Sequence, residues 1–227
     1  MTAQFGIGDI FSETFRIALR NWLPMLLYGL VVTAVGTGVE LTVGERAGTL
    51  ADSLVSFILG YVLFVVFWKR ENLPFAGWSV LTVVIYLVAS LLGGVAIGIG
   101  FLMLIVPGLL LMARWSLMPS FIVGRGMRMG EAFSESWAAT REKQWTLVGF
   151  YAVLIVAVVI VLGGLGATLG IIELADRNGG EVLATGSVAN FIVETLGNAA
   201  TAFGYATSVA LYVLLVEHGG DEESIFG

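Results

Sequence analysis

The sequence predicts an all-α integral membrane protein with six transmembrane helices, two cytoplasmic-side interfacial amphipathic helices and a candidate parallel internal repeat. The composition, the hydropathy and the spacing of charges lead to this fold class. Of the 227 residues, 58% are apolar and 12% are charged, whereas soluble domains carry roughly 25% charged residues. The mean hydropathy is +0.94, and long uncharged stretches separate short charged segments. This apolar excess is too large for one soluble core, so we expect lipid to cover part of the surface.

Apolar runs long enough for a span, ~20 residues, define the individual helices. They cover residues 23–41, 54–68, 78–119, 147–172 and 195–216. No charged residue lies between Glu71 and Arg114, so the third run holds either two spans joined by a tight turn or one kinked span and a re-entrant segment. Glycine tolerates the backbone angles of tight turns, and a glycine cluster therefore predicts where the chain reverses. Its members are Gly93, Gly94, Gly98 and Gly100.

The distribution of Lys and Arg favours six spans over five, because basic residues concentrate on the cytoplasmic side. With six spans, only Arg46 and Arg177 lie outside, whereas five spans divide the basic residues almost equally. The residues placed inside are Arg16, Arg20, Lys69, Arg70, Arg114, Arg125, Arg128, Arg141 and Lys143. We therefore expect a multi-pass protein of the plasma (inner) membrane, with both termini in the cytoplasm and residues 44–52 and 173–190 outside. No cleavable signal peptide is predicted, and the first span stays as an anchor.

The expected organisation is a single membrane domain over residues 1–227. It consists of an interfacial helix (1–22), spans one to four (23–123), a second interfacial helix (129–145), spans five and six (146–216) and an acidic tail (217–227). Both short helices carry apolar residues at helical spacing, with acidic residues early and basic residues late, as the helix dipole favours. Such helices lie in the membrane interface. The alternative is an ordinary cytoplasmic helix packed on the bundle.

The two amphipathic segments also resemble each other. Residues 10–15 (Ile-Phe-Ser-Glu-Thr-Phe) match residues 132–137 (Ala-Phe-Ser-Glu-Ser-Trp), and Gly60–Tyr61 matches Gly204–Tyr205. We predict two parallel copies of an interfacial helix followed by a helical hairpin, with spans three and four inserted between the copies. Chance similarity in a sequence of low complexity is the alternative.

Polar residues of the sixth span recur at steps of three and four, which places them on one helix face. They are Asn190, Glu194, Asn198, Thr201, Tyr205, Ser208 and Tyr212. Because hydrocarbon offers these groups no partner, the face should point into the bundle. It forms either a packed seam of interhelical hydrogen bonds or a polar cavity open to the outer side, with Glu40 and Glu194 near its mouth.

Arg114 is the one basic residue that falls inside the cytoplasmic half of a span. Its guanidinium either reaches a lipid phosphate at the interface or pairs with a carboxylate inside the bundle. Pro107, seven residues earlier, lacks a backbone N–H, so we expect it to kink or interrupt the fourth helix.

No residue pattern indicates catalysis, a cofactor or a metal. The chain has no cysteine, its one histidine is His218, and no GxxxxGK, GxSxG or HExxH motif occurs. Acid–base chemistry would have to rest on Glu40, Glu194 or Tyr205. The net charge of −6 and the pI near 4.8 exclude nucleic acid as a partner.

A set of short motifs resembles one known family. It comprises residues 105–108 with Pro107 and Gly108, residues 114–117 with Trp115, then Pro119, Glu131, Ser136, Trp137 and Arg141. This set is similar to the YciC-like inner-membrane proteins and to the membrane domain fused to some glycerophosphodiester phosphodiesterases, over about residues 5–218. The resemblance implies a six-helix plasma-membrane protein. The catalytic phosphodiesterase domain is absent, so the hydrolase activity cannot be carried over.

The sequence thus predicts a non-catalytic polytopic plasma-membrane protein that is associated with the envelope or with lipids, or that is an accessory subunit of a larger membrane assembly. Its expected partners are membrane lipids and other membrane subunits. The alternative is a small-solute or ion transporter that uses the polar face of the sixth span.

Overall fold

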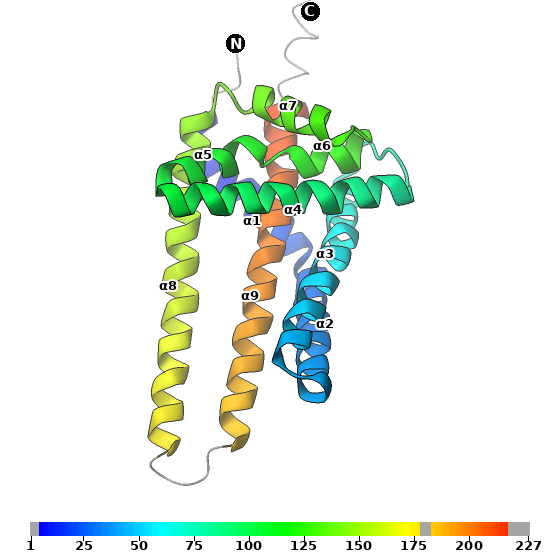
Figure 1. The fold of residues 1–227 in the computed structure, drawn as a ribbon. Helices are drawn as coiled ribbons and strands as arrows, with labels where there is room; N and C mark the ends of the chain where they lie inside the picture. Colours follow the sequence, from blue (N-terminus) through cyan, green and yellow to red (C-terminus); the bar gives the residue numbers. More distant parts are fainter. Residues whose placement is uncertain (1–4, 178–182, 218–227) are drawn as a thin grey trace, which may run out of the picture. The chain divides into compact units, whose positions relative to one another are not determined.

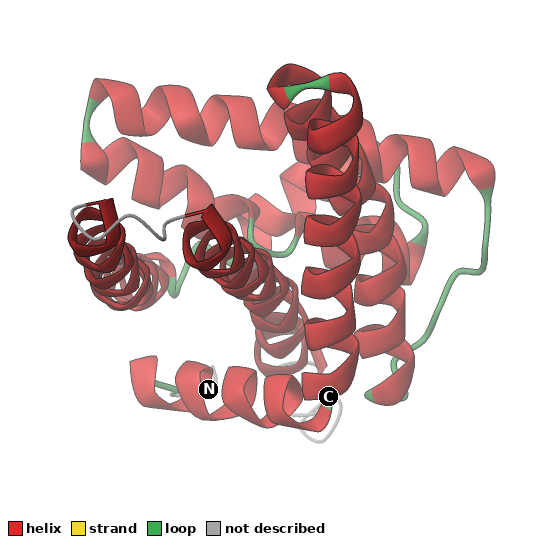
Figure 2. Ribbon diagram, turned by 90° about the horizontal axis from the view of Figure 1, so that it is seen from below, coloured by secondary structure: helices red, strands yellow, loops and turns green. Residues whose placement is uncertain are grey.

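The computed structural model describes residues 5–177 and 183–217, apart from the side chains of 162 and 169–190. The described chain consists of helices joined by short loops and contains no strand (Figures 1 and 2). Its elements are α1 (Ile7–Arg20), α2 (Trp22–Val43), α3 (Glu45–Arg70), α4 (Val80–Met103), α5 (Ile105–Trp115), α6 (Met118–Arg125), α7 (Met129–Ala139), α8 (Gln144–Arg177), α9 (Leu183–Tyr212) and the π-helical turn η1 (Val213–Glu217). The predicted acidic tail, beyond Glu217, and residues 178–182 of the second outer loop lie outside the described residues.

Six helical stretches of the described chain are long and apolar enough to cross a membrane, which confirms the predicted number. They are Trp22–Val43, Glu45–Arg70, Val80–Met103, Ile105–Arg125, Gln144–Thr168 and Phe191–Glu217. The fourth stretch consists of α5 and α6 in succession.

The described residues form two compact units. The first comprises Met1–Asn21, Tyr61–Val153 and Gly204–Gly227, and the second comprises Trp22–Gly60 and Leu154–Phe203. Helices α3, α8 and α9 each contribute residues to both units.

The predicted reversal at the glycine cluster is wrong. Helix α4 continues through the cluster to Met103, and the chain turns at Leu104, whose backbone is extended (φ −163°, ψ 147°). The last glycine of the cluster serves close packing instead, because a Cβ on Gly100 would lie 3.0 Å from the Cα of Gly108. Glycine lacks the side chain that would hold two helices apart, so α4 and α5 pack closely just beside the turn.

The predicted kink at Pro107 is also absent. Pro107 is the third residue of α5, within the first helical turn. The N–H groups of that turn have no intrahelical acceptor, so the missing proline N–H costs the helix nothing there. Pro107 thus lies within the first turn of α5 and does not bend the helix.

Aromatic side chains fill the core of the first unit. Trp68 is fully buried, donates from Nε1 to the Pro74 carbonyl oxygen at 2.8 Å and packs on Tyr212. Gly124 of α6 faces the Trp68 indole so closely that any Cβ would overlap the ring. In this unit α4 runs beside α5, and both run transverse to the direction of the α9 segment 204–212 (Figure 1).

In the second unit, α2 packs on both α3 and α9. Tyr28 and Ser56 share a hydroxyl hydrogen bond of 2.6 Å between α2 and α3. On the side of α9, a Cβ on Gly29 would lie 2.8 Å from the Thr195 carbonyl oxygen. A glycine at this position therefore sets how closely α2 approaches α9.

Candidate functional site

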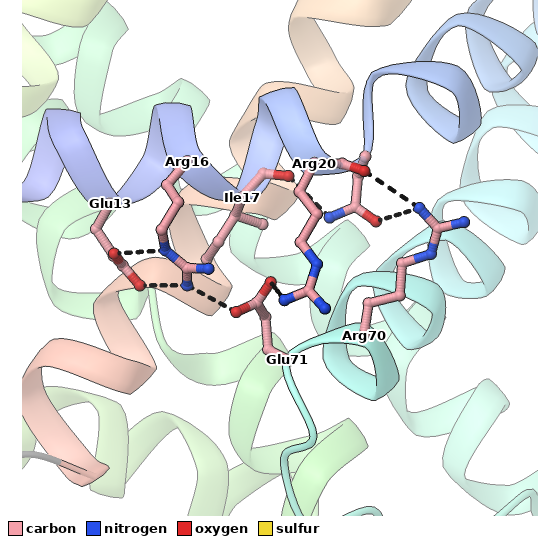
Figure 3. A network of polar contacts seen from close by, with 7 residues as sticks. Glu13, Arg16, Ile17, Arg20, Arg70 and Glu71 are labelled. Carbon is pink, nitrogen blue, oxygen red and sulfur yellow. Dashed lines mark hydrogen bonds and ion pairs between the residues drawn. The ribbon is translucent and has the colours of Figure 1, made fainter.

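A network of charged residues holds α1 to the end of α3 (Figure 3). The Glu71 carboxylate, just after α3, accepts hydrogen bonds from Arg16 at 2.6 Å and from Arg20 at 3.4 Å. Arg70 donates to the Arg20 carbonyl oxygen at 3.3 Å and to the Asn21 side chain at 3.2 Å. Glu71 is nearly buried, with 7% of its side chain exposed. We call these residues, together with Glu13, the Glu71 network.

Arg16 is the most strongly held cation of the Glu71 network. It also makes a bidentate pair with Glu13, with N–O distances of 2.6 and 2.9 Å. Hydrogen bonding to Glu13, opposed by partial burial and reinforced by Glu71, raises the pKa of Arg16 above its already high value. Arg16 therefore stays charged at neutral pH.

Helix α1 has two apolar sides that differ in how far they are buried. Ile10 and Ile17 are fully buried, and Phe11 packs on Phe150 with ring centroids 4.6 Å apart. Phe15 and Leu19, by contrast, are 51% and 68% exposed. The helix thus presents a packed face to the protein and a second apolar face outward.

Helix α7 is fixed to the α5–α6 connection by its small polar residues. The Ser136 hydroxyl donates to the Arg114 carbonyl oxygen at 2.7 Å and accepts from the Leu117 N–H at 3.2 Å. Ser136 and Thr140 are fully buried. This contact supports the alternative in which α7 packs on its neighbours, although Trp137 on the same helix is 41% exposed.

Arg114 lies beneath α7 in an environment that the sequence did not predict. Its guanidinium donates to the Trp137 carbonyl oxygen at 3.0 Å and to the side-chain oxygen of Gln144, and it lies 4.8 Å from the centroid of the Trp137 ring. The residue is 6% exposed. Within the described chain the ion pairs belong to Arg16 and Arg20, so the alternative in which Arg114 pairs with a carboxylate inside the bundle is not found there.

The residues that carry the family resemblance gather around the same helices. Trp115 packs edge-on against Phe133 of α7, with centroids 5.0 Å apart, and Pro119 lies in the first turn of α6. Glu131 caps α7 by accepting from the Arg128 N–H at 3.1 Å. These positions therefore start helices or join α7 to α5 and α6, and Arg141 is exposed just beyond α7.

The polar face of α9 is divided between the two units. In the first unit, Ser208 is buried and donates to the Ser116 carbonyl oxygen at 2.6 Å, and Tyr205 contacts Phe64 with centroids 6.5 Å apart. Tyr212 accepts from Arg125 Nε at 3.1 Å. These side chains meet neighbouring helices, as predicted.

In the second unit, only part of the polar face is packed. Asn198 donates to the Thr33 hydroxyl of α2 at 3.0 Å. The expectation that Thr201 faces a neighbouring helix is wrong, because Thr201 is exposed and donates to the Gly197 carbonyl oxygen of its own helix at 3.3 Å. A threonine can satisfy its hydroxyl within its own helix, so it needs no partner across the bundle. The side chain of Asn190 lies outside the described residues.

Three carboxylates lie near one another at the 40–52 end of the second unit. Glu194 is exposed, and Asp52 and Glu40 are close enough to repel it. The sequence predicted Glu40 and Glu194 at this place but not Asp52. Among the described residues, no group of His, Cys, Asp or Glu is arranged to hold a metal ion.

Sequence reasoning missed two partners that organise these sites. The spacing of charges identifies Glu71 only as the start of a charge-free stretch, and no motif includes Gln144. A lone acid directly after the basic pair Lys69–Arg70 is a signal for Glu71, whereas the sequence contains no signal that joins Gln144 to Arg114.

The comparisons with known proteins identify a family but no function. No curated protein and no solved structure matches the chain. A family model described as a domain of unknown function, DUF7847, matches residues 37–215. This range includes four of the six long apolar helices in full, most of Phe191–Glu217, the end of Trp22–Val43 and the whole of α7. The chain therefore belongs to the DUF7847 family.

Proposed function

We propose that this chain is a non-catalytic protein of the plasma (inner) membrane, with six spans, that associates with lipids or serves as an accessory subunit of a larger membrane assembly. The observation that carries the proposal is the exposure of large apolar side chains along the long helices. They include Leu27 and Val31 of α2, Leu91, Val95 and Ile99 of α4, and Val156, Val159 and Ile160 of α8. A soluble protein rarely exposes contiguous apolar surface on this scale, and lipid tails would cover it.

Helix α1 supports an interfacial role at the cytoplasmic side. Helix α1 carries exposed Phe15 and Leu19 next to Arg16 and Arg20. Aliphatic and aromatic residues beside arginines fit the boundary between acyl chains and phosphate groups. Since these arginines precede the first long helix, both termini are proposed to face the cytoplasm.

The burial pattern of α1 and α7 supports the parallel repeat. Ile10 and Thr14 are fully buried, as are their counterparts Ala132 and Ser136, and Phe15 is exposed like its counterpart Trp137. Both helices also begin with an acidic cap. Asp9 accepts from the Gly6 N–H at 2.7 Å, and Glu131 accepts from the Arg128 N–H at 3.1 Å. The resemblance to the YciC-like proteins stays a prediction.

The contacts of α9 favour a packed seam over the transport alternative. Asn198 bonds to Thr33, and Ser208 bonds to Ser116. Each of these polar groups is satisfied by a neighbouring helix, as in interhelical hydrogen bonding, and the exposed position of Thr201 interrupts the polar face.

Cysteine labelling in intact cells tests the proposed topology. The chain has no native cysteine, so a single cysteine reports one position. With six spans, cysteines at Thr49 and Leu104 react with an impermeant maleimide, and a cysteine at Arg128 reacts only after the cells are opened. Leu104 is the decisive position, because two separate spans would place the turn between α4 and α5 outside. A re-entrant hairpin would leave this turn inaccessible from outside. Recovery of the chain in the soluble fraction would contradict the whole proposal.

A further inference from the structure

Arg114 is a buried cation without an anionic partner in the described chain. Two of its guanidinium nitrogens donate to neutral acceptors, the Trp137 carbonyl oxygen and the Gln144 amide oxygen. Its third nitrogen, Nε, is buried and has no hydrogen-bond partner. Removing a charge from water is costly unless an opposite charge compensates it. The neutral acceptors leave the net charge of Arg114 in place.

The surroundings of Arg114 are positive. Arg141 is exposed and directly follows Thr140, whose hydroxyl donates to the Arg114 carbonyl oxygen at 3.4 Å. Lys143 follows two residues later, with its ammonium 5.0 Å from the centre of the Phe5 ring. Glu142 is the one acid in this turn between α7 and α8, and it is exposed. It makes no ion pair with Arg114. The turn therefore keeps a positive excess.

The start of α8 adds a further attraction for an anion. Gln144 is the first residue of this 34-residue helix, so the hydrogen bond from Arg114 to Gln144 places the guanidinium at a helix N-terminus. The first N–H groups of a helix lack intrahelical acceptors, and the helix dipole is positive at this end. Phosphate groups commonly bind at such ends.

We propose that Arg114, Arg141 and the N-terminus of α8 bind the phosphate group of an anionic ligand, with Trp137 covering Arg114. We call these residues the Arg114 site. A guanidinium matches a phosphate group in charge and in paired hydrogen-bond geometry. The phosphate belongs either to a lipid headgroup or to a free phosphate ion. This inference rests on the proposed function and deepens it, because it names the chemistry that the protein recognises at the interface.

The test uses the purified full-length chain in a non-ionic detergent. Binding and thermal stability are titrated with dihexanoyl phosphatidic acid, with dihexanoylglycerol, which lacks the phosphate, and with sodium phosphate against sodium chloride at equal ionic strength. We expect saturable binding of a phosphate-bearing probe and none of dihexanoylglycerol. If phosphatidic acid saturates the site and sodium phosphate does not, the ligand is a lipid headgroup. If sodium phosphate also saturates the site, the ligand is free phosphate.

Three Arg→Gln variants locate the binding. Arg141→Gln and Arg114→Gln should each weaken the affinity about tenfold or more, as expected for the loss of a charged hydrogen-bond donor. Arg128→Gln removes the same charge from another exposed turn and should leave the affinity unchanged. Because Arg141 is exposed, Arg141→Gln decides the matter even where Arg114→Gln does not fold.

Two results would overturn the Arg114 site: no saturable binding of either phosphate probe, or equal weakening by Arg128→Gln and Arg141→Gln. Membrane fractionation separates this failure from failure of the proposed function. A chain that stays in the membrane fraction but does not bind phosphate loses only the site. A chain found in the soluble fraction loses the proposed membrane role, while the sodium phosphate titration still reports on the Arg114 site.

Discussion

The rings of Trp68 and Tyr212 pack against each other with their centroids 4.6 Å apart. Each residue stands seven positions after the tyrosine of a matched Gly–Tyr pair, Tyr61 in α3 and Tyr205 in α9. The contact therefore joins equivalent positions of the two copies in the proposed repeat.

Gly124→Ala should destabilise the first unit. The new Cβ would overlap the indole of Trp68, which is fully buried and cannot move aside. Overpacking of this kind typically costs about 1–3 kcal/mol. Thermal unfolding of the purified protein in detergent measures the loss. Gly130→Ala is the matched control, because nothing lies within 4 Å of a Cβ on that glycine, and alanine favours the helix. An equal loss in both variants would contradict the packing described for Trp68.

Glu71→Gln should loosen α1. The substitution leaves Arg16 and Arg20 without their shared carboxylate. We expect a loss of about 1–2 kcal/mol, less than for a fully buried charged pair, because both arginines are about half exposed. Faster hydrogen exchange of the α1 amides is the direct readout. Glu135→Gln, an exposed acid of α7, is the control. Unchanged exchange in α1 after Glu71→Gln would show that apolar packing alone holds the helix.

Thr33 and Asn198 should be energetically coupled. Their hydrogen bond of 3.0 Å joins α2 to α9, and hydrogen bonds between membrane helices are worth about 0.6 kcal/mol on average and up to about 2 kcal/mol. A double-mutant cycle with Thr33→Val and Asn198→Leu measures the coupling. Thr201→Val is the control and should be nearly neutral, since Thr201 bonds only within its own helix. In a packed seam, solute flux stays near zero in every variant. Flux that is lost with Asn198→Leu while the fold survives would favour transport instead.

Ser136→Ala should cost about as much as Trp137→Ala, although it removes a single oxygen. The Ser136 hydroxyl is fully buried and bonds to both Arg114 and Leu117, so its loss strands buried polar groups at about 1–3 kcal/mol. A fully packed tryptophan would lose about 3–5 kcal/mol on truncation to alanine. Trp137 is 41% exposed, so we expect about 1–2 kcal/mol. Denaturation in detergent compares the two variants, and a Trp137→Ala loss above 3 kcal/mol would mean that the ring is buried by a partner or by lipid.

Hydropathy was sufficient to predict the helical class and the number of long apolar helices, because both depend on residue type over stretches of about 20 residues. It could not place the turn between α4 and α5. The glycines of residues 93–100 suit both turns and close helix packing, and only the tertiary contact between Gly100 and Gly108 distinguishes these uses.

The sites were less predictable than the fold. Helical periodicity correctly placed Asn198 and Ser208 against neighbouring helices, but it assigned Thr201 to the same face because spacing does not reveal a hydroxyl that bonds to its own backbone. The partners of Arg114 come from Trp137 and Gln144, on two later helices. Such long-range contacts leave no periodic pattern in a single sequence.

The Glu71 network also orders events during synthesis. A chain emerges from the ribosome N-terminus first, so α1 is complete while its acceptor, 55 residues beyond Arg16 and 51 beyond Arg20, has yet to be translated. Until then these two arginines lack the carboxylate that they share in the finished protein. The entire α2–α3 hairpin is made in the interval. Docking of α1 through Glu71 can therefore occur only after the α2–α3 hairpin has been translated. Formation of the two ion pairs shows that translation of this hairpin is complete.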